Sequence, residues 1–258
     1  MKEQLCYVYF DGAQAEARIV AYEANIPKWK EQFERARLNP GSYDAHVALA
    51  SEMFKIPYEL VPTFDVNPDG TFTIRYTAKR CRHGLNYRMQ APRLATTAKL
   101  PLAYAYEVYD IYHTTTPELR IWWDAIIKEV YDTRMLTTCL GRRIVFPGSK
   151  IDDDLLDSII AFKPQSTLGD HISSVQYKAP EDDEWPRYAR IPFNNHDSLI
   201  AMCRQTDALK VARVLRKYAE APLLIKGEQL IIPSEFKMSQ ADEKGMHRWE
   251  NMKKIKDF

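Results

Sequence analysis

The alternation of apolar and polar residues predicts strands near both ends of the chain and helices between them. Residues 5–10 form a short run rich in aromatic and β-branched residues that ends at Asp11 and Gly12, which predicts a strand ending in a carboxylate. Near the other end, the apolar runs 190–193 and 198–202 flank the polar residues 194–197. This pattern is typical of a β-hairpin with polar residues at its tip.

Apolar residues at helical spacing predict helices between and after these strands, at residues 14–25, 43–54, 73–87, 102–112, 117–131, 154–162, 165–175 and 207–218. We expect Pro27 to close the first helix, Pro92 to lie near the end of the third, and Pro164 to interrupt or kink the sixth. Residues 67–70 (Asn-Pro-Asp-Gly) predict a turn. A short β run is expected in 141–148 and a last strand or hairpin at 222–232, followed by a charged, solvated tail. The order predicts an α+β fold, with one discontinuous antiparallel sheet domain carrying a helical insertion.

Composition narrows the class of protein. The 258 residues suffice for one large domain or two smaller ones, and 45% of them are hydrophobic, which is ordinary for a globular protein. The formal net charge of +1 excludes a strong overall basic field, so any nucleic-acid binding must rely on local patches. The four cysteines have no metal-ligand spacing, which favours reduced thiols in a cytoplasmic protein. No apolar run predicts a signal peptide or a membrane span.

Asp11 and Asp197 are the first candidates for chemistry. Each lies at the end of a predicted strand, and both could lie at one rim of the same sheet. Two carboxylates brought together repel each other unless a cation lies between them, and Mg²⁺ accepts one or two carboxylates together with substrate phosphates. Two such ions would stabilise the attacking and leaving oxygens of a phosphoryl displacement. The alternative is that each aspartate is merely a turn residue.

Residues 71–100 form a basic segment that supports the first interpretation. This segment contains seven lysines and arginines and no acidic residue. On a helix, Arg75, Lys79, His83 and Tyr87 recur every four residues and share one stripe. They offer donors for a triphosphate and an aromatic plane for a base. The alternative is a solvated basic face.

Five segments, in order, resemble motifs of a known family. They are Asp11-Gly-Ala-Gln14-Ala-Glu16-Ala-Arg18-Ile-Val-Ala21, Arg75-x-x-x-Lys79-x-x-x-His83-Gly84-x-Asn86-Tyr87, Gly141-Arg142-Arg143 with Phe146-Pro147, Gln165-Ser-Thr-Leu-Gly-Asp170, and Asn194-Asn195-His196-Asp197. The first, second and last resemble motifs A, B and C of family A (polymerase I-like) DNA polymerases, and the other two resemble stretches that lie between B and C. The resemblance covers nearly the whole chain, and His83 with the residues that follow it is similar to the phage-type branch.

The resemblance implies a polymerase palm with an antiparallel sheet, and a helical fingers subdomain inserted between motifs A and C. The expected ranges are 1–26 for the first palm segment, 27–136 for the fingers and 137–258 for the second palm segment. The implied activity is DNA-directed DNA polymerisation, in which two Mg²⁺ ions, with Mn²⁺ as a substitute, assist transfer of dNTPs to a primer 3′ end.

The resemblance also implies a role for each matched residue. Asp11 and Asp197 would bind the metal ions, and Lys79 would touch the triphosphate and donate a proton to the departing pyrophosphate. The residues expected to contact the incoming nucleotide are Arg75, Lys79, His83, Tyr87, Gln14 and Glu16, with Glu16 excluding a 2′-hydroxyl. The residues expected to contact primer-template DNA are Arg18, Arg142, Arg143, Gln165, Asn194 and His196.

The sequence departs from the family pattern at several positions. His83 replaces Phe or Tyr, Arg88 replaces the Gly that follows the motif B Tyr, and Ser198 replaces the third acid. Gly12 and Ala13 replace Tyr and Ser of motif A, and Ala161 stands where the family often has Asn. We expect two carboxylates to suffice for catalysis with reduced metal affinity.

The sequence opens almost at motif A, which leaves no room for a thumb or an exonuclease domain before it. We therefore expect weak DNA binding, and either a second polymerase chain that carries those parts or a truncated reading of a longer protein. The expected location is the cytoplasm, or the host cytoplasm if the protein is encoded by a phage, without contact to a membrane. The alternatives are a non-catalytic nucleic-acid-binding subunit and, disfavoured by the Gln14, Glu16 and Arg18 pattern, a single-subunit RNA polymerase.

Overall fold

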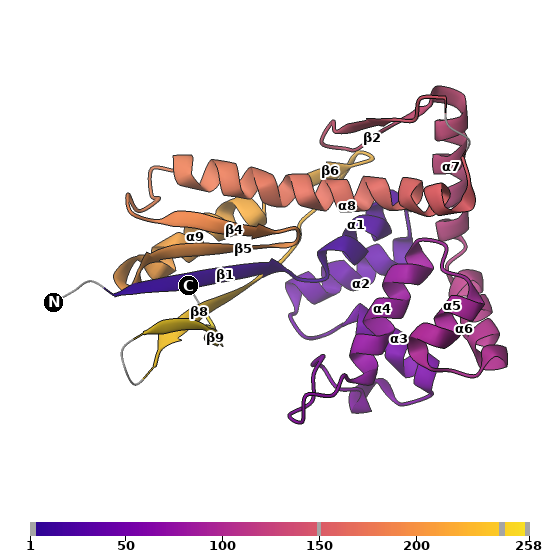
Figure 1. Ribbon diagram of the computed structural model, residues 1–258, viewed down its shortest axis with the longest axis horizontal. Coiled ribbons are helices and arrows are strands. Elements are labelled where there is room, and N and C mark those ends of the chain that lie inside the picture. Colours follow the sequence, from indigo (N-terminus) through magenta and orange to yellow (C-terminus); the bar gives the residue numbers. More distant parts are fainter. Residues whose placement is uncertain (1–3, 149–150, 243–245, 256–258) are drawn as a thin grey trace. The chain divides into compact units, whose positions relative to one another are not determined.

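The computed structural model describes residues 4–148, 151–242 and 246–255, so the outer ends of the predicted palm ranges lie outside it (Figure 1). The chain forms two compact units. Unit 1 comprises Met1–Glu16, Thr138–Arg142 and Gln165–Phe258, and unit 2 comprises Ala17–Thr137 and Arg143–Pro164. Each unit is therefore assembled from segments that are distant in the sequence.

Unit 1 contains a five-stranded antiparallel sheet, as the sequence predicts. The strand order is β4-β5-β1-β8-β9, which places the first strand of the chain at the centre (Figure 1). The strands are β1 (Leu5–Gly12), β4 (Arg190–Asn195), β5 (Ser198–Arg204), β8 (Ser234–Ala241) and β9 (His247–Lys254). Segments from both ends of the sequence thus form one sheet, and the prediction of an α+β fold with an antiparallel sheet is confirmed.

The two faces of β1 differ in polarity. Phe10 lies on the buried face and contacts Phe236 of β8, with their ring centroids 5.7 Å apart. Helix α9 (Ala208–Ala219) packs on this face, where the Arg216 guanidinium lies 5.2 Å from the Phe236 ring centre. Because side chains alternate along a strand, Tyr9 and Asp11 lie on the opposite face. The candidate carboxylate therefore points away from the helical layer.

The C-terminal segment is more ordered than predicted. Strands β6 (Leu223–Ile225) and β7 (Glu228–Leu230) form the expected hairpin, but it is not the last element of the sheet structure. The expected solvated tail instead contains β8 and β9, which pair with each other. Phe236 and Ser239 are buried while Lys237 between them is exposed, so charges on the outer face conceal the strand pattern.

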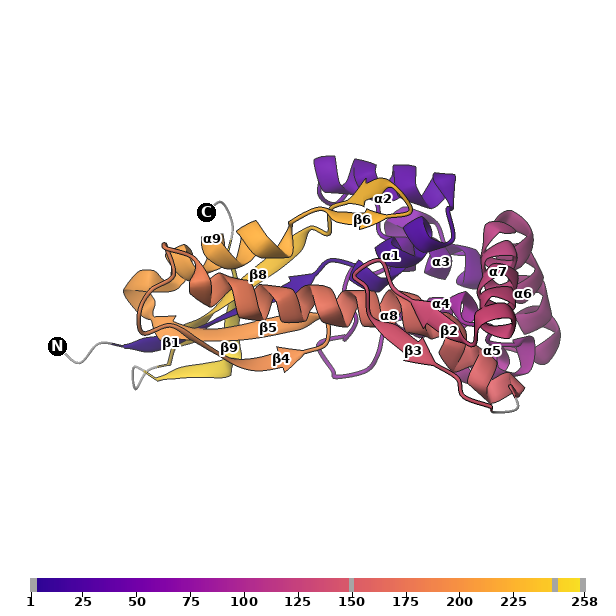
Figure 2. The ribbon, with the colours of Figure 1, turned by 90° about the horizontal axis from the view of Figure 1, so that it is seen from above.

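Unit 2 is mainly helical (Figure 2). Its elements are α1 (Ala15–Glu23, beginning in unit 1), α2 (Pro27–Leu38), α3 (Ala45–Phe54), α4 (Ile74–Asn86), α5 (Ala91–Ala98), α6 (Leu102–Thr115), α7 (Glu118–Thr133), the short strands β2 (Met135–Thr137) and β3 (Arg143–Val145), and the first part of α8 (Asp153–Lys178). Single-turn 3₁₀ helices lie at Tyr58–Leu60 in unit 2 and at Ala179–Glu181 and Gln205–Asp207 in unit 1.

Two of the three prolines singled out in the sequence lie where one helix has ended and the next begins. Pro27 begins α2, because the first turn of a helix needs no N–H donor at that position. Pro92 likewise lies in the first turn of α5 and does not mark the end of the preceding helix. Pro164 lies inside α8, which is continuous across it. Ile160 before it and Leu168 after it are both buried, and the helix is not interrupted at Pro164.

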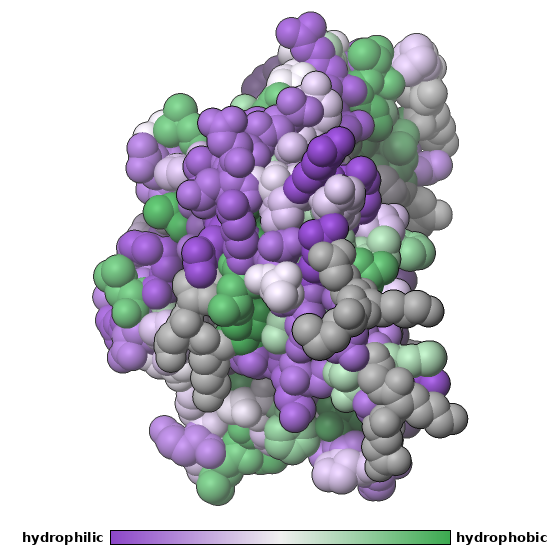
Figure 3. Space-filling view, turned by 90° about the vertical axis from the view of Figure 1, so that its left-hand side faces the viewer, coloured by the Kyte–Doolittle hydropathy of each residue, from purple (hydrophilic) through white to green (hydrophobic). Residues whose placement is uncertain are grey.

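The surface carries mixed side chains. In the view of Figure 3, hydrophobic residues are separated by hydrophilic ones. Among the residues that the structure describes, no helix combines the length and hydrophobicity needed to cross a bilayer. The three cysteines Cys6, Cys81 and Cys203 are buried and reduced, and Cys139 is exposed.

Candidate functional site

Asp11 and Asp197 are brought together in unit 1, as predicted. Asp11 at the end of β1 pairs directly with Ser198 at the start of β5, and Asp197 is the residue before Ser198. The backbone N–H of Gly12 donates to the carbonyl oxygen of Asp197 at 3.2 Å. Two segments separated by more than half of the sequence therefore place their carboxylates at neighbouring strand ends.

The packing around Gly12 leaves little room for a side chain. A Cβ atom at this position would lie 3.0 Å from the Cβ of Ala15 and 3.3 Å from the Cγ2 of Ile232. Such contacts are too tight without a shift of the surrounding chain. The replacement of the motif A Tyr by Gly12 is thus suited to the close packing of β1 and α1 here.

The tip of the β4–β5 hairpin contacts the second part of α8. His196 has a φ of 57°, and its Nδ1 lies 3.5 Å from where a Cβ on Gly169 would be. Asn194 donates from its Nδ2 to Oε1 of Gln176 at 2.9 Å. Helix α8 therefore supports the hairpin while the side chains of Asn194 and His196 remain exposed.

The Tyr9 side chain lies beside the Asp11 carboxylate. Its hydroxyl donates to Oδ2 of Asp11 at 2.7 Å. Burial raises the pKa of Tyr9, and the negative charges of Asp11 and, to a smaller extent, Asp197 raise it further.

The donor set fits a hard divalent cation. Asp11 and Asp197 are both partly exposed and provide carboxylate oxygens, which Mg²⁺ prefers in combination with substrate oxygens and water. Ser198, buried directly opposite Asp11, occupies the position of the expected third acid. Within the described ranges, no three His, Cys, Asp or Glu residues form a metal-binding cluster. A cation here would depend on two carboxylates and on the substrate.

The basic stripe of α4 lies in unit 2 and is balanced by acids from other segments. Arg75 donates from Nη2 to Oδ2 of Asp44 at 2.7 Å and from Nη1 to Oδ1 of Asp65. Lys79 lies 3.6 Å from Oδ2 of Asp65. The absence of acids within 71–100 therefore does not leave this surface unbalanced. Neither Asp44 nor Asp65 was identified from the sequence, since both precede the basic segment.

The C-terminal end of α4 is held rigidly. The His83 and Tyr87 rings meet edge to face with centroids 5.2 Å apart, and His83 is exposed whereas Tyr87 is buried. Asn86 accepts from the Tyr112 hydroxyl at 2.8 Å through its side chain and from Trp123 Nε1 at 2.8 Å through its backbone oxygen. These contacts fix the end of the helix that carries the predicted sugar and base contacts.

Arg88, which replaces the Gly of the family pattern, keeps a backbone conformation typical of glycine. Its φ is 66°, in the left-handed region where glycine is favoured. Its guanidinium lies near Asp157 at 3.2 Å and Asp153 at 3.4 Å, both on α8 in unit 2. The chain therefore keeps the glycine-like turn, with an arginine that ties α4 to α8.

The remaining predicted DNA contacts differ in accessibility. Arg142 is exposed and its Nε donates to both carboxylate oxygens of Asp170, at 2.8 and 3.0 Å, so two of the five motif segments meet. Arg143 is exposed and Gln165 is partly exposed. Arg18 is buried in unit 2 and donates to the backbone oxygen of Phe33 at 3.0 Å, so this conformation does not offer it to DNA.

Two predicted nucleotide contacts lie just after β1 in unit 1. Gln14 has a φ of 53°, and Glu16 is in the first turn of α1. Both are partly exposed. They follow Gly12 at the turn between β1 and α1, close in sequence to the candidate carboxylate Asp11.

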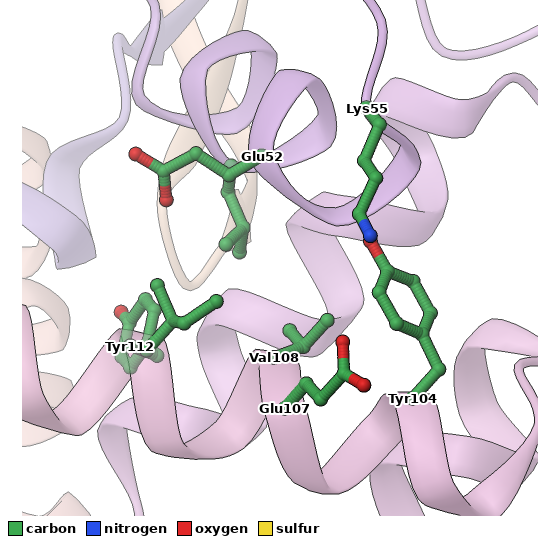
Figure 4. A pocket seen from close by; sticks show the side chains of 8 residues that line it. Glu52, Lys55, Tyr104, Glu107, Val108 and Tyr112 are labelled. Atoms are coloured by element: carbon green, nitrogen blue, oxygen red, sulfur yellow. The ribbon is translucent and has the colours of Figure 1, made fainter.

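A cavity of about 80 Å³ in unit 2 contains none of the predicted residues (Figure 4). It lies between α3 and α6, and its lining includes Lys55, whose Nζ is 4.7 Å from the ring centre of Tyr104. Glu52 and Glu107 also line it. This small cavity is separate from the residues that carry the candidate chemistry.

Comparison with known proteins identifies the family of this chain. The family model "DNA polymerase family A" matches residues 1–243, and the chain therefore belongs to DNA polymerase family A. Members of this family use divalent metal ions. Two curated proteins that this chain resembles are both named DNA polymerase I.

The chain is 28% identical over 158 residues to DNA polymerase I of Rhizobium leguminosarum, which covers 61% of this chain and 14% of that protein. It is 24% identical over 219 residues to DNA polymerase I of Helicobacter pylori strain J99, which covers 83% of this chain and 22% of that protein. The chain thus spans less than a quarter of the length of these curated relatives.

The fold is similar to that of a solved polymerase domain. The POL domain of Pol1 from M. smegmatis, in complex with DNA primer-template and dNTP, matches with a TM-score of 0.71 and 21% identity. The match covers 92% of this chain and 40% of that one. At this identity the likeness establishes the fold alone.

Proposed function

We propose that this chain is the palm-and-fingers portion of a DNA-directed DNA polymerase that adds deoxynucleotides to a primer 3′ end. The observation that carries the proposal is that Asp11 and Asp197 lie at neighbouring strand ends in a family A domain. Unit 1 would be the palm and unit 2 the fingers. The reaction is a phosphoryl transfer that depends mainly on positioning and electrostatic stabilisation.

In this proposal Asp11 and Asp197 hold two Mg²⁺ ions, for which Mn²⁺ can substitute. When bound, these ions supply Lewis-acid stabilisation of the charge that develops on the phosphate oxygens. Arg75 and Lys79 bind the triphosphate, and Lys79 gives a proton to the departing pyrophosphate oxygen. The exposed amino group of Lys79 is accessible for this role.

The other predicted residues would position the substrates. His83, Tyr87, Gln14 and Glu16 would contact the incoming nucleotide, with Glu16 filling the space that a 2′-hydroxyl needs. Arg142, Arg143, Gln165, Asn194 and His196 would contact primer and template, largely through phosphates. Arg18 would join them only after leaving its buried position against Phe33.

We further propose that the polymerase belongs to the phage-type branch and works in the cytoplasm, or in the host cytoplasm if it is phage-encoded. Its substrates would be dNTPs and primer-template DNA. A second polypeptide, or a further part of the same protein, would provide the thumb and the exonuclease. DNA affinity rises with the number of phosphates contacted, so this chain by itself would bind DNA weakly.

Primer extension tests the proposal. The chain is assayed with and without an N-terminal family A portion supplied in trans, with Mg²⁺, and with Asp197→Asn as the site variant. We expect extension in the reconstituted mixture and a loss of at least about 10²-fold in Asp197→Asn, because one proposed metal ligand is removed. Asp183→Asn, an exposed acid of unit 1, is the control and should retain activity.

A second candidate is a nucleic-acid-binding subunit that does not turn over nucleotides. Ser198 favours it, since this uncharged residue lies directly opposite Asp11. In that case Asp197→Asn would leave the activity of the reconstituted enzyme unchanged. Incorporation of rNTPs in place of dNTPs separates the RNA polymerase alternative, and Glu16→Ala should relax the choice of sugar.

A further inference from the structure

Two cations in the amino-terminal half of α4, Arg75 and Lys79, form a compact cluster with two carboxylates from preceding segments of unit 2. Arg75 contacts Asp44 through Nε and Nη2, at 3.1 and 2.7 Å, and contacts Asp65 through Nη1. Oδ2 of Asp65 lies 3.6 Å from the Lys79 ammonium. The two oxygens of Asp65 thus face two different cations. The cluster contains two positive and two negative groups and is formally neutral.

Asp44 and Asp65 differ in how firmly they are held. Asp44 caps α3, where its Oδ1 accepts from the backbone N–H groups of His46 and Val47 at 2.8 and 3.1 Å. Its second oxygen is used by Arg75, so this carboxylate has a permanent structural role. Asp65 has no such cap to maintain, and its side chain is 29% exposed.

The loop that carries Asp65 is fixed through its backbone. The N–H of Thr73 donates to the carbonyl oxygen of Asp65 at 2.9 Å, and the Thr73 hydroxyl donates to Phe64 O at 2.7 Å. Val66 and Phe72 form a β-bridge that closes the same loop. The carboxylate of Asp65 can therefore leave the cations by side-chain rotation while the loop keeps its shape.

We propose that the Asp65 carboxylate occupies the anion site formed by Arg75 and Lys79 and is displaced by the triphosphate of the incoming nucleotide, so that Asp65 sets nucleotide affinity. The inference rests on the proposed function for the identity of the anion. A planar carboxylate bridging a guanidinium and an ammonium satisfies the same donors that bind phosphate oxygens. An entering triphosphate meets a neutral cluster until Asp65 rotates away, and meets a net positive one afterwards.

The displacement is favoured by the accessibility of the cluster. Lys79 is 53% exposed whereas Arg75 is 13% exposed, so an anion reaches the ammonium first. Arg75 then exchanges Asp65 for the ligand and keeps Asp44, which holds the guanidinium in place. Asp65 therefore acts as a specificity-determining residue: weakly charged anions do not displace it, and polyphosphates do.

Calorimetric titration with inorganic tripolyphosphate tests the proposal on the whole chain, without metal and without DNA. Asp65→Asn should bind tripolyphosphate about fivefold more tightly than the wild type, the gain expected when a competing partly exposed ion pair is removed. Asp69→Asn is the matched control, since it removes the same charge from the same loop while Asp69 contacts only Thr71 among the described residues. It should bind like the wild type. Arg75→Gln in the Asp65→Asn background should abolish the gain.

Equal or weaker binding by Asp65→Asn than by Asp69→Asn overturns the proposal, as does the absence of binding in both the wild type and Asp65→Asn. Asp65→Ser, which also preserves the backbone contacts of the loop, must show the same gain, and the thermal unfolding of each variant confirms that it is folded. Primer extension by the reconstituted wild type is read separately. Primer extension without a gain in tripolyphosphate affinity refutes only the proposed role of Asp65. A gain in affinity without primer extension refutes the polymerase function but not the anion site at Arg75 and Lys79.

Discussion

Replacement of Tyr9 by Phe probes the group that holds Asp11. The substitution removes one hydroxyl, which donates to Oδ2 of Asp11 at 2.7 Å, and leaves the ring contact with Trp249, where the centroids are 5.3 Å apart. A hydrogen bond to a charged acceptor contributes about 1.5–3 kcal/mol. Both side chains are partly exposed, so we expect a loss around the lower end of this range, about 1–2 kcal/mol, in the free energy of unfolding of unit 1.

A double-mutant cycle in urea measures this energy directly. It compares wild type, Tyr9→Phe, Asp11→Ala and the double variant, and the expected coupling energy is about 1–2 kcal/mol. Tyr7→Phe is the matched control, because Tyr7 lies on the same face of β1 and, in the part of the chain that is described, its hydroxyl makes no hydrogen bond to a carboxylate. Direct Mn²⁺ titration followed by electron paramagnetic resonance should also show weaker binding by Tyr9→Phe, since Asp11 loses its orienting donor.

Two results would refute this reasoning. The first is a coupling energy near zero, which would mean that the hydroxyl and the carboxylate do not interact in solution. The second is an equal destabilisation by Tyr7→Phe, which would assign the effect to the loss of any tyrosine hydroxyl on this strand. Unchanged Mn²⁺ affinity in Tyr9→Phe would restrict the role of Tyr9 to stability.

Three further outcomes are expected. Burial, assisted by the positive charge of Arg120, lowers the pKa of His113 from 6.5 to about 4, so the unfolded state binds more protons between these pH values. The free energy of unfolding should therefore fall by up to about 3 kcal/mol as the pH falls through this range, and by less in His113→Phe. Urea unfolding at several pH values would measure this. Arg142→Gln should weaken primer-template binding evenly across sequences and reduce the salt slope by about one, measured by fluorescence anisotropy. Gly12→Ala should destabilise unit 1 by about 1–3 kcal/mol in thermal or urea unfolding, because its Cβ would lie 3.0 Å from that of Ala15. A pH slope unchanged by His113→Phe, a salt slope unchanged by Arg142→Gln, or a Gly12→Ala chain as stable as the wild type would contradict the respective argument.

The sequence was sufficient to predict the carboxylate pair and the sheet that carries it. Residues 5–10 and the runs around 194–197 combine strand composition with polar ends, and strand pairing then brings Asp11 beside Ser198. It was not sufficient to predict β8 and β9, because Lys237 and Lys254 place charges on the exposed face of these strands and hide the buried Phe236. Composition alone describes such a segment as a solvated tail.

The charge balance of the basic segment could not be predicted from the sequence. A stretch without acids indicates an exposed basic surface only if no acid reaches it from elsewhere in the fold. Asp44 and Asp65 neutralise Arg75, and Asp153 and Asp157 approach Arg88, each from a segment outside the basic stretch. The burial of Arg18 could not be predicted from the sequence either. Its motif position suggests a DNA contact, but in this conformation its guanidinium packs against Phe33.

How firmly an acidic residue is held decides whether a ligand can displace it from the arginine or lysine that it contacts. Asp170 holds Arg142 from a rigid helix, and Asp44 holds Arg75 from a helix cap, so these contacts persist while the ligand uses the remaining donors of the guanidinium. Asp65 comes from a loop whose backbone is fixed independently of its carboxylate, so it is the partner that yields. A phosphate that binds Arg142 must therefore share the side chain with Asp170, whereas one that binds Arg75 and Lys79 replaces Asp65. Under the proposed function, DNA binding by unit 1 would respond to salt through shared charges, and nucleotide binding by unit 2 would respond to the removal of a single carboxylate.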